Sequence, residues 1–167
     1  MAIKAIVFDW GDTVMRDFPF PGPMKSWPFV SVIPDMEETL TELKKDYYII
    51  LASNAGDSTT FDIIDALERV GLSKYFHHVF SSKDLGFEKP DIRFFQAIEK
   101  ELKLSGDEVV MIGNNCEKDI KGAHQLKWKC VWFNEDQVNK NECKEADATI
   151  YHMAGLSQLI KILSDNE

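Results

Sequence analysis

The stretch Ile3–Thr13 reads Ile-Lys-Ala-Ile-Val-Phe-Asp-Trp-Gly-Asp-Thr, an apolar run that ends in polar, turn-forming residues. Its apolar part, Ile3–Phe8, combines β-branched and aromatic residues over a length typical of a buried strand. Asp9 is the first residue beyond that run, so we expect it at the carboxyl end of the strand. Strands buried on both faces occur mainly in parallel sheets covered by helices. This stretch therefore predicts an α/β fold with a polar loop after its first strand.

Similar apolar runs recur along the chain and alternate with helical patterns, which implies right-handed crossovers and helices on both faces of one sheet. We predict a three-layer, Rossmann-like α/β fold with a mainly parallel central sheet, as one domain over residues 1–167. The expected strands are Ile3–Phe8, Tyr47–Ala52, His78–Ser81, Glu108–Ile112, Lys129–Phe133 and Ala148–Ile150. The expected helices begin at Asp35, at Asp57 or Ser58, near Asp91, near Asp119 and at Leu156.

Two of these helices carry local start signals. Asp35, with Glu38 three residues later, matches a capping box. Asp57 or Ser58 is expected to cap the next helix, and Gly71 is expected to close it. The inward-facing stripe of that helix is expected to consist of Phe61, Ile64, Leu67 and Val70.

Composition and charge narrow the class of protein. The 167 residues carry a formal net charge of −9, which argues against the basic surface of a nucleic-acid-binding protein. No apolar run approaches the roughly 18 residues needed to span a bilayer, and no secretory signal is evident at the N-terminus. The three cysteines, Cys116, Cys130 and Cys143, fit no metal-ligand spacing. We therefore expect a cytoplasmic protein with reduced thiols and no membrane partner.

The segment Phe18–Phe29 is the one compositional oddity, because four prolines and a glycine stand among its aromatic residues. Such a segment cannot form a regular helix. It lies within residues 14–33, an insert too short for a folded domain. Exposed aromatics in this number need covering, so we expect the segment to act as a short flap or as a contact between subunits of a homo-oligomer.

Polar residues follow four of the predicted strands, and in a parallel sheet these four loops meet at one edge. Carboxylate and amide oxygens there suit Mg²⁺, while a lysine and the metal neutralise phosphate charge. A remaining carboxylate can attack phosphorus. The four loops, which together form a site suited to phosphoryl transfer, are Asp9–Thr13, Ser53–Asn54, Phe87–Asp91 and Gly113–Asp119.

The same residues resemble, in order, the four motifs of the haloacid dehalogenase superfamily. Its first motif, Asp-x-Asp-x-Thr after a hydrophobic strand, is similar to Asp9–Thr13. Its strand-ending Ser or Thr matches Ser53, and its lysine, often followed by proline, matches Lys89. Its fourth motif, Gly-Asp-x-x-x-x-Asp, resembles Gly113–Asp119. The resemblance covers nearly the whole chain and implies a Mg²⁺-dependent hydrolase, most often a phosphatase with an aspartyl-phosphate intermediate.

By this resemblance Asp9 is the nucleophile and a metal ligand, and the Gly11 carbonyl is a second ligand. Asn114 takes the place of a ligating aspartate, and its amide oxygen can still bind Mg²⁺ with one less negative charge. Asp119 either orients Lys89 or is an outer metal partner. The remaining expected substrate contacts are Ser53, Lys89 and Asn54, although Asn54 could instead only shape its turn.

The sequence departs from the superfamily pattern at Gly11, where the family has the aspartate that acts as general acid and base. Either the loop is kinked at Gly11 so that Asp12 substitutes as a catalytic residue, or Asp12 points elsewhere and caps the following turn. Losing such a group typically slows catalysis by about 10²–10⁴-fold.

Three hypotheses follow. The first is a phosphatase without a cap domain, acting on a phosphorylated small molecule or macromolecule. The second is a catalytically impaired phosphate- or partner-binding protein on the same fold. The third is phosphonate or carbon–halogen cleavage, which we rank last because those relatives usually need a cap to desolvate a small substrate.

Overall fold

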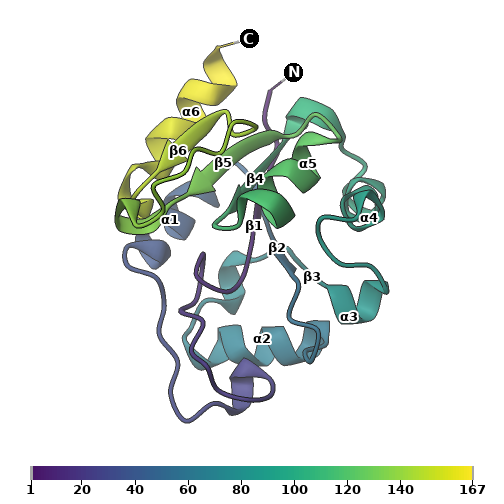
Figure 1. The fold of residues 1–167 in the computed structure, drawn as a ribbon, viewed down its shortest axis with the longest axis vertical. Helices are drawn as coiled ribbons and strands as arrows, with labels where there is room; N and C mark the ends of the chain where they lie inside the picture. Colours follow the sequence, from purple (N-terminus) through teal and green to yellow (C-terminus); the bar gives the residue numbers. More distant parts are fainter. Residues whose placement is uncertain (1, 167) are drawn as a thin grey trace.

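The computed structural model describes residues 2–166 and has one six-stranded sheet at its centre (Figure 1). All neighbouring strands are parallel, in the order β3-β2-β1-β4-β5-β6, so the prediction of a mainly parallel α/β sheet is confirmed. The strands are β1 Ala5–Phe8, β2 Tyr48–Ser53, β3 His78–Ser81, β4 Val109–Gly113, β5 Lys129–Phe133 and β6 Ala148–Ile150.

Helices occupy the connections between the strands from β1 to β5, as the strand–helix alternation predicts, and one more helix follows β6. They are α1 Met36–Leu43, α2 Thr60–Arg69, α3 Ser82–Leu85, α4 Ile92–Leu102, α5 Gly122–His124 and α6 Leu156–Asp165. A π-helical turn, Cys116–Lys121, runs directly into α5. No helix among residues 2–166 combines the length and the apolar character that crossing a membrane requires.

Two apolar cores lie on opposite faces of the sheet because successive side chains of a strand point to opposite faces. In β1, Ile6 and Phe8 belong to the core packed against α1, α2 and α6. Ala5 and Val7 face the other core, which is packed against α4 and α5. All four side chains are fully buried. The predicted three-layer arrangement is therefore confirmed.

The N-cap of α1 is Asp35 as predicted, but the expected capping box is absent, and the predicted cap of α2 is wrong. Asp35 precedes α1 with a φ of 65° and makes no side-chain capping bond. The cap of α2 is Thr59, which forms a capping box with Asp62, and not Asp57 or Ser58. The predicted inward-facing stripe is correct at Leu67, which is buried together with Ile63 and Ala66, and wrong at Phe61, which is 78% exposed.

The segment of residues 14–33 lies beside α2 and is fixed at its base. Arg16 donates its backbone N–H to Ser31 O, and Ile33 donates to Val14 O. Its aromatic rings pack mainly against one another. The ring pairs, with centroid distances of 4.9–5.6 Å, are Phe18–Phe29, Phe20–Phe29 and Phe20–Trp27. Trp27 is buried, whereas Phe29 is 54% exposed; a contact between subunits through this segment stays a prediction.

The Arg69 side chain, at the end of α2, attaches this segment to the helix. Its guanidinium donates to the carbonyl of Trp27 at 2.7 Å and lies 3.4 Å from those of Met24 and Lys25. Lys25 in turn pairs with Asp62 of α2 at 2.6 Å. We call residues 14–33 the flap below.

The expectation of three reduced thiols is wrong, because Cys116 and Cys143 form a disulfide. The bridge joins the π-helical turn after β4 to the loop before β6. Sequence spacing did not reveal it, since the fold brings together two cysteines that are 27 residues apart. Cys130 is the free cysteine, and burial raises the pKa of its thiol to about 12. It is therefore a poor nucleophile for thiol exchange.

Replacing Cys143 with serine should lower the free energy of unfolding by about 3 kcal/mol, because the bridge constrains a long loop in the unfolded chain. Urea unfolding with and without reductant measures this effect. Reductant should shift the wild-type curve to that of Cys143→Ser and leave the variant unchanged. A wild-type curve that ignores the reductant would contradict the bridge.

Candidate active site

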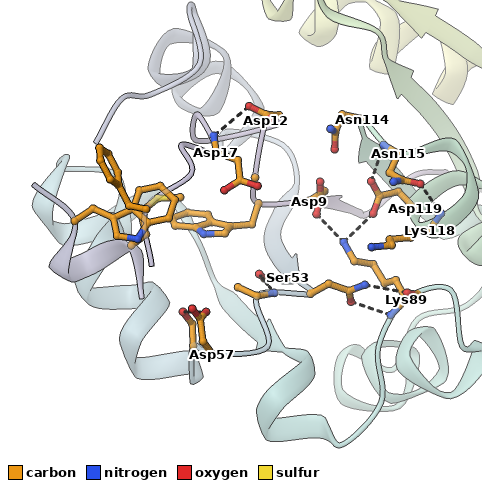
Figure 2. A pocket seen from close by; sticks show the side chains of 18 of the residues that line it. Asp9, Asp12, Asp17, Ser53, Asp57, Lys89, Asn114, Asn115, Lys118 and Asp119 are labelled. Carbon is orange, nitrogen blue, oxygen red and sulfur yellow. Dashed lines mark hydrogen bonds and ion pairs between the residues drawn. The ribbon is translucent and has the colours of Figure 1, made fainter. Parts of the chain in front are cut away.

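The carboxyl ends of β1, β2 and β4 form the candidate site. Phe8, the last residue of β1, is in register with Leu51 of β2 and Ile112 of β4. Asp9 directly follows, and its backbone N–H donates to Ile112 O at 2.9 Å. A cavity of about 380 Å³ opens at this edge (Figure 2). The predicted loops do converge, and Asp9, Ser53, Lys89, Asn114 and Asp119 all line that cavity.

Lys89 lies at the bottom of the site between two carboxylates. Its ammonium donates to Asp9 Oδ1 at 2.7 Å, to Asp119 Oδ1 at 2.8 Å and to the carbonyl of Ala52 at 2.8 Å. The lysine side chain is 1% exposed. Burial alone would lower the pKa of Lys89, but the charges of Asp119 and Asp9 outweigh it and raise that pKa. The ammonium therefore stays charged.

The carboxylates of Asp9 and Asp119 share the single ammonium group of Lys89, and this arrangement shifts the pKa of Asp119. Burial first, and then repulsion from Asp9, raises the pKa of Asp119 to about 6, against the opposing attraction of Lys89. Both Asp119 oxygens are engaged within the protein, because Oδ2 accepts the backbone N–H of Asn115 at 3.1 Å. This geometry matches the role of orienting Lys89 and leaves neither oxygen free of a protein donor.

Gly113 allows Asp119 to come this close to the end of β4. A Cβ added at Gly113 would lie 2.3 Å from Asp119 Oδ2, far inside contact distance. The requirement for glycine at this position of the fourth loop is therefore steric.

Asn54 positions the backbone of Lys89. Its side-chain amide donates to Lys89 O at 2.9 Å and accepts from Lys89 N at 2.8 Å. This reciprocal pair connects the loop after β2 to the loop that carries the lysine. Of the two roles considered for Asn54, shaping the local structure is the one with visible contacts; a contact with substrate stays a prediction.

Ser53 ends β2 and is 1% exposed. Its hydroxyl accepts the backbone N–H of Ala55 at 2.9 Å, which fixes the start of the following loop. The hydroxyl hydrogen is left to donate toward the cavity that Ser53 lines. This arrangement suits an anionic oxygen in the cavity.

Oxygen donors that suit a hard cation face one another beside Asp9. The Thr13 hydroxyl lies 3.2 Å from Asp9 Oδ2 and 3.4 Å from Asn114 Oδ1. Trp132 Nε1 donates to Asn114 O at 2.9 Å and fixes that residue's backbone. The bridge between Gly11 and Met15 uses Trp10 O and Asp12 N, so it leaves the Gly11 carbonyl available. Carboxylate, amide and carbonyl oxygens together fit Mg²⁺.

The structure turns the Asp12 side chain away from Asp9. Asp12, and not Gly11, has the positive φ, at 57°. Its Oδ1 accepts the backbone N–H of Asp17 at 3.1 Å (Figure 2) and lies 3.9 Å from the guanidinium of Arg16. This is the second of the two alternatives considered for Asp12, in which it caps the following turn.

Asp17 also lines the cavity, and no sequence motif singles it out. Its carboxylate points toward Asp9 (Figure 2). The residue as a whole is exposed, yet partial burial of its carboxyl group, followed by repulsion from Asp12, Asp9 and Asp57, raises its pKa. No motif includes this position, since it lies in the irregular flap.

Comparison with known proteins agrees with this geometry. A family model described as haloacid dehalogenase-like hydrolase matches residues 27–127, more than half of the chain. The chain belongs to the haloacid dehalogenase-like hydrolase family. The family resemblance predicted from the four loops is thereby confirmed.

Two curated relatives of this haloacid dehalogenase-like chain are named as phosphatases. Glyceraldehyde 3-phosphate phosphatase of Pyrococcus furiosus is 26% identical over 81% of this chain and 55% of the relative. Ribulose-1,5-bisphosphate 5-phosphatase of Halopiger xanaduensis is 33% identical over 72% of this chain and 46% of the relative. The chain thus spans about half the length of the curated relatives that it matches.

Solved structures show the same haloacid dehalogenase-like fold. An uncharacterized protein from Listeria monocytogenes serotype 4b superposes with a TM-score of 0.84 at 23% identity, over 96% of this chain and 98% of the other. A phosphatase of the superfamily from Thermococcus onnurineus gives 0.78 at 18% identity, over 95% and 98%. At these identities the likeness concerns the fold.

Replacing Lys89 with methionine should destabilise the protein by about 3–5 kcal/mol, because it leaves two largely buried carboxylates without their cation. Lys118→Met is the matched control: Lys118 lines the same cavity but is exposed, so its removal should change stability by less than about 0.5 kcal/mol. Urea unfolding of both variants measures the difference. Equal unfolding free energies would show that Lys89 does not hold the site together.

Proposed function

We propose that this chain is a Mg²⁺-dependent phosphatase that acts through an aspartyl-phosphate intermediate at Asp9. The observation that carries the proposal is the buried ion triad of Lys89, Asp9 and Asp119 at the carboxyl ends of three parallel strands. In this triad Asp9 Oδ1 accepts a hydrogen bond from the Lys89 ammonium. Asp9 Oδ2 lies beside the Thr13 hydroxyl, on the side of the oxygen atoms that could bind a metal. A carboxylate held in this way is oriented for attack on a phosphorus atom.

The residues around Asp9 supply the other requirements of phosphoryl transfer. The Ser53 hydroxyl orients a phosphoryl oxygen, and the charge of Lys89 offsets the negative charge that gathers at Asp9 and phosphorus. Asp9, the Gly11 carbonyl and Asn114 would hold Mg²⁺. When bound, that ion neutralises phosphate charge and orients the group for in-line attack.

The substrate class we propose is a small phosphorylated metabolite, for which the phosphatase relatives' named sugar phosphates are the first compounds to test. We also propose that residues 1–167 work as one unit without a cap domain. The flap would then form the wall of the entrance, since Phe20, Met24 and Trp27 line the cavity. Function in the cytoplasm belongs to the same proposal.

A second candidate function is phosphate or partner binding without turnover. Gly11 and Asn114 favour it, because each removes a carboxylate that the superfamily pattern has at that position. The two functions differ in one outcome, which is the turnover of a phosphate ester.

Turnover of nitrophenyl phosphate and of the two sugar phosphates should require Mg²⁺ and should stop in Asp9→Asn, because an amide is not a nucleophile toward phosphorus. Chelation should abolish activity, and added Mg²⁺ should restore it. Acid-quenched wild-type protein should carry a phosphoryl group on the peptide that contains Asp9. Phosphate binding without turnover in the folded wild-type protein would instead support the binding function.

A further inference from the structure

The space beside Gly11 is occupied by another carboxylate. A Cβ added at Gly11 would lie 3.2 Å from Asp17 Cβ and 3.3 Å from both Cγ and Oδ2 of Asp17. These distances are tighter than nine in ten real Cβ contacts, so the Asp17 side chain would have to move by a few tenths of an ångström to admit a Cβ. The Asp17 side chain therefore runs alongside the place where an aspartate at position 11 would begin.

The backbone does not explain the glycine at this position. Gly11 is not among the described residues with positive φ, so a residue with a side chain could adopt its conformation. The neighbouring Asp17 side chain is instead what crowds a Cβ at this position. Glycine at position 11 and aspartate at position 17 are thus two parts of one arrangement.

Hydrogen bonds fix the backbone at Asp17 and at the residue before it. The backbone N–H of Asp17 donates to Asp12 Oδ1, and the preceding residue, Arg16, donates its backbone N–H to Ser31 O across the base of the flap. The Arg16 guanidinium also pairs with Glu135 at 2.5 Å. The Asp17 carboxylate is directed into the cavity toward Asp9 (Figure 2).

The other unassigned carboxylates of the cavity do not share this position. Asp12 binds the backbone of Asp17 and lies near the guanidinium of Arg16. Asp57 lies on the loop after β2, where Oδ1 accepts from the Ser58 hydroxyl, and it is placed away from Asp9 (Figure 2). Asp17 alone of these three stands beside the position of the absent aspartate.

We propose that Asp17 is the general acid and base of the site and replaces from the flap the aspartate that Gly11 lacks. The inference rests on the proposed phosphatase function and names the residue that gives and takes protons in that reaction. It assigns a catalytic role to a residue outside the four motifs.

The proposed steps balance with water as the only co-reactant. An oxygen of Asp9 forms a bond to phosphorus while the bond from phosphorus to the ester oxygen breaks. The electron pair goes to that oxygen, which takes the proton of the Asp17 carboxyl group. A water oxygen then attacks phosphorus and gives a proton to the Asp17 carboxylate, and the bond from phosphorus to Asp9 breaks. Alcohol and phosphate leave, and both carboxyl groups return to their starting states.

Two substrates that differ in leaving group test this role in the full chain with Mg²⁺. Nitrophenolate leaves without a proton, whereas an alkoxide from an alkyl phosphate needs one. In Asp17→Asn, turnover of the alkyl phosphate should fall by about 10²–10⁴-fold. With nitrophenyl phosphate the first step should survive, so phosphoenzyme should accumulate as a burst because its hydrolysis lacks a base. A merely structural role would slow both substrates alike.

Asp57→Asn is the matched control, because it removes a carboxylate from the same cavity and should leave both rates within about twofold of wild type. The double variant Gly11→Asp/Asp17→Ala should recover alkyl phosphate turnover relative to Asp17→Ala, since the carboxylate is returned from the neighbouring position. Thermal unfolding of each variant reports whether it is folded.

The outcomes separate the two proposals. Equal effects of Asp17→Asn and Asp57→Asn in an active protein overturn the role of Asp17 and leave the phosphatase function standing. Loss of both substrates in equal proportion, with no burst and no recovery in the double variant, overturns it as well. A folded wild type with neither turnover nor phosphoenzyme overturns both proposals.

Discussion

The site depends on one buried ammonium group between two carboxylates. Lys89 comes from the loop before α4, Asp9 from the end of β1, and Asp119 from the turn after β4. The same ammonium also donates to the carbonyl of Ala52 in β2. Three strand ends are thereby tied to one point, and removing the charge would leave repulsion where there is now attraction. The close approach at Gly113 and the amide contacts of Asn54 both serve to bring these groups together.

The sequence predicts most of the fold and the central part of the site, because both follow from patterns that are local in the chain. Apolar runs define the strands, and parallel strands bring the residues after them to a common edge. What the sequence misses depends on contacts between distant segments. The Cys116–Cys143 bridge and the clamp of Asn54 on the Lys89 backbone are examples.

Asp17 is missed for a related reason. The chain between Asp12 and Asp17 turns back on itself, and no periodicity predicts the direction of a side chain in such a segment. A kink at Gly11 is one of the two alternatives that the sequence leaves open, and the positive φ lies at Asp12 instead. Asp12 and Asp17 both line the cavity, but the Asp12 carboxylate accepts the backbone N–H of Asp17. The cap of α2 is missed because three consecutive residues, Asp57, Ser58 and Thr59, are all suitable helix caps. The structure uses Thr59.

The attachment of the flap to α2 by Arg69 has a consequence for how a ligand is received. A loop that must fold over its ligand loses conformational entropy when it does so, and that loss weakens binding. Here the loop is already fastened by the Arg69 guanidinium, by Lys25 and Asp62, and by edge-to-face contacts among its own rings. Its shape is set when the chain folds. Discrimination among ligands therefore rests on a fixed outline that a molecule either matches or does not.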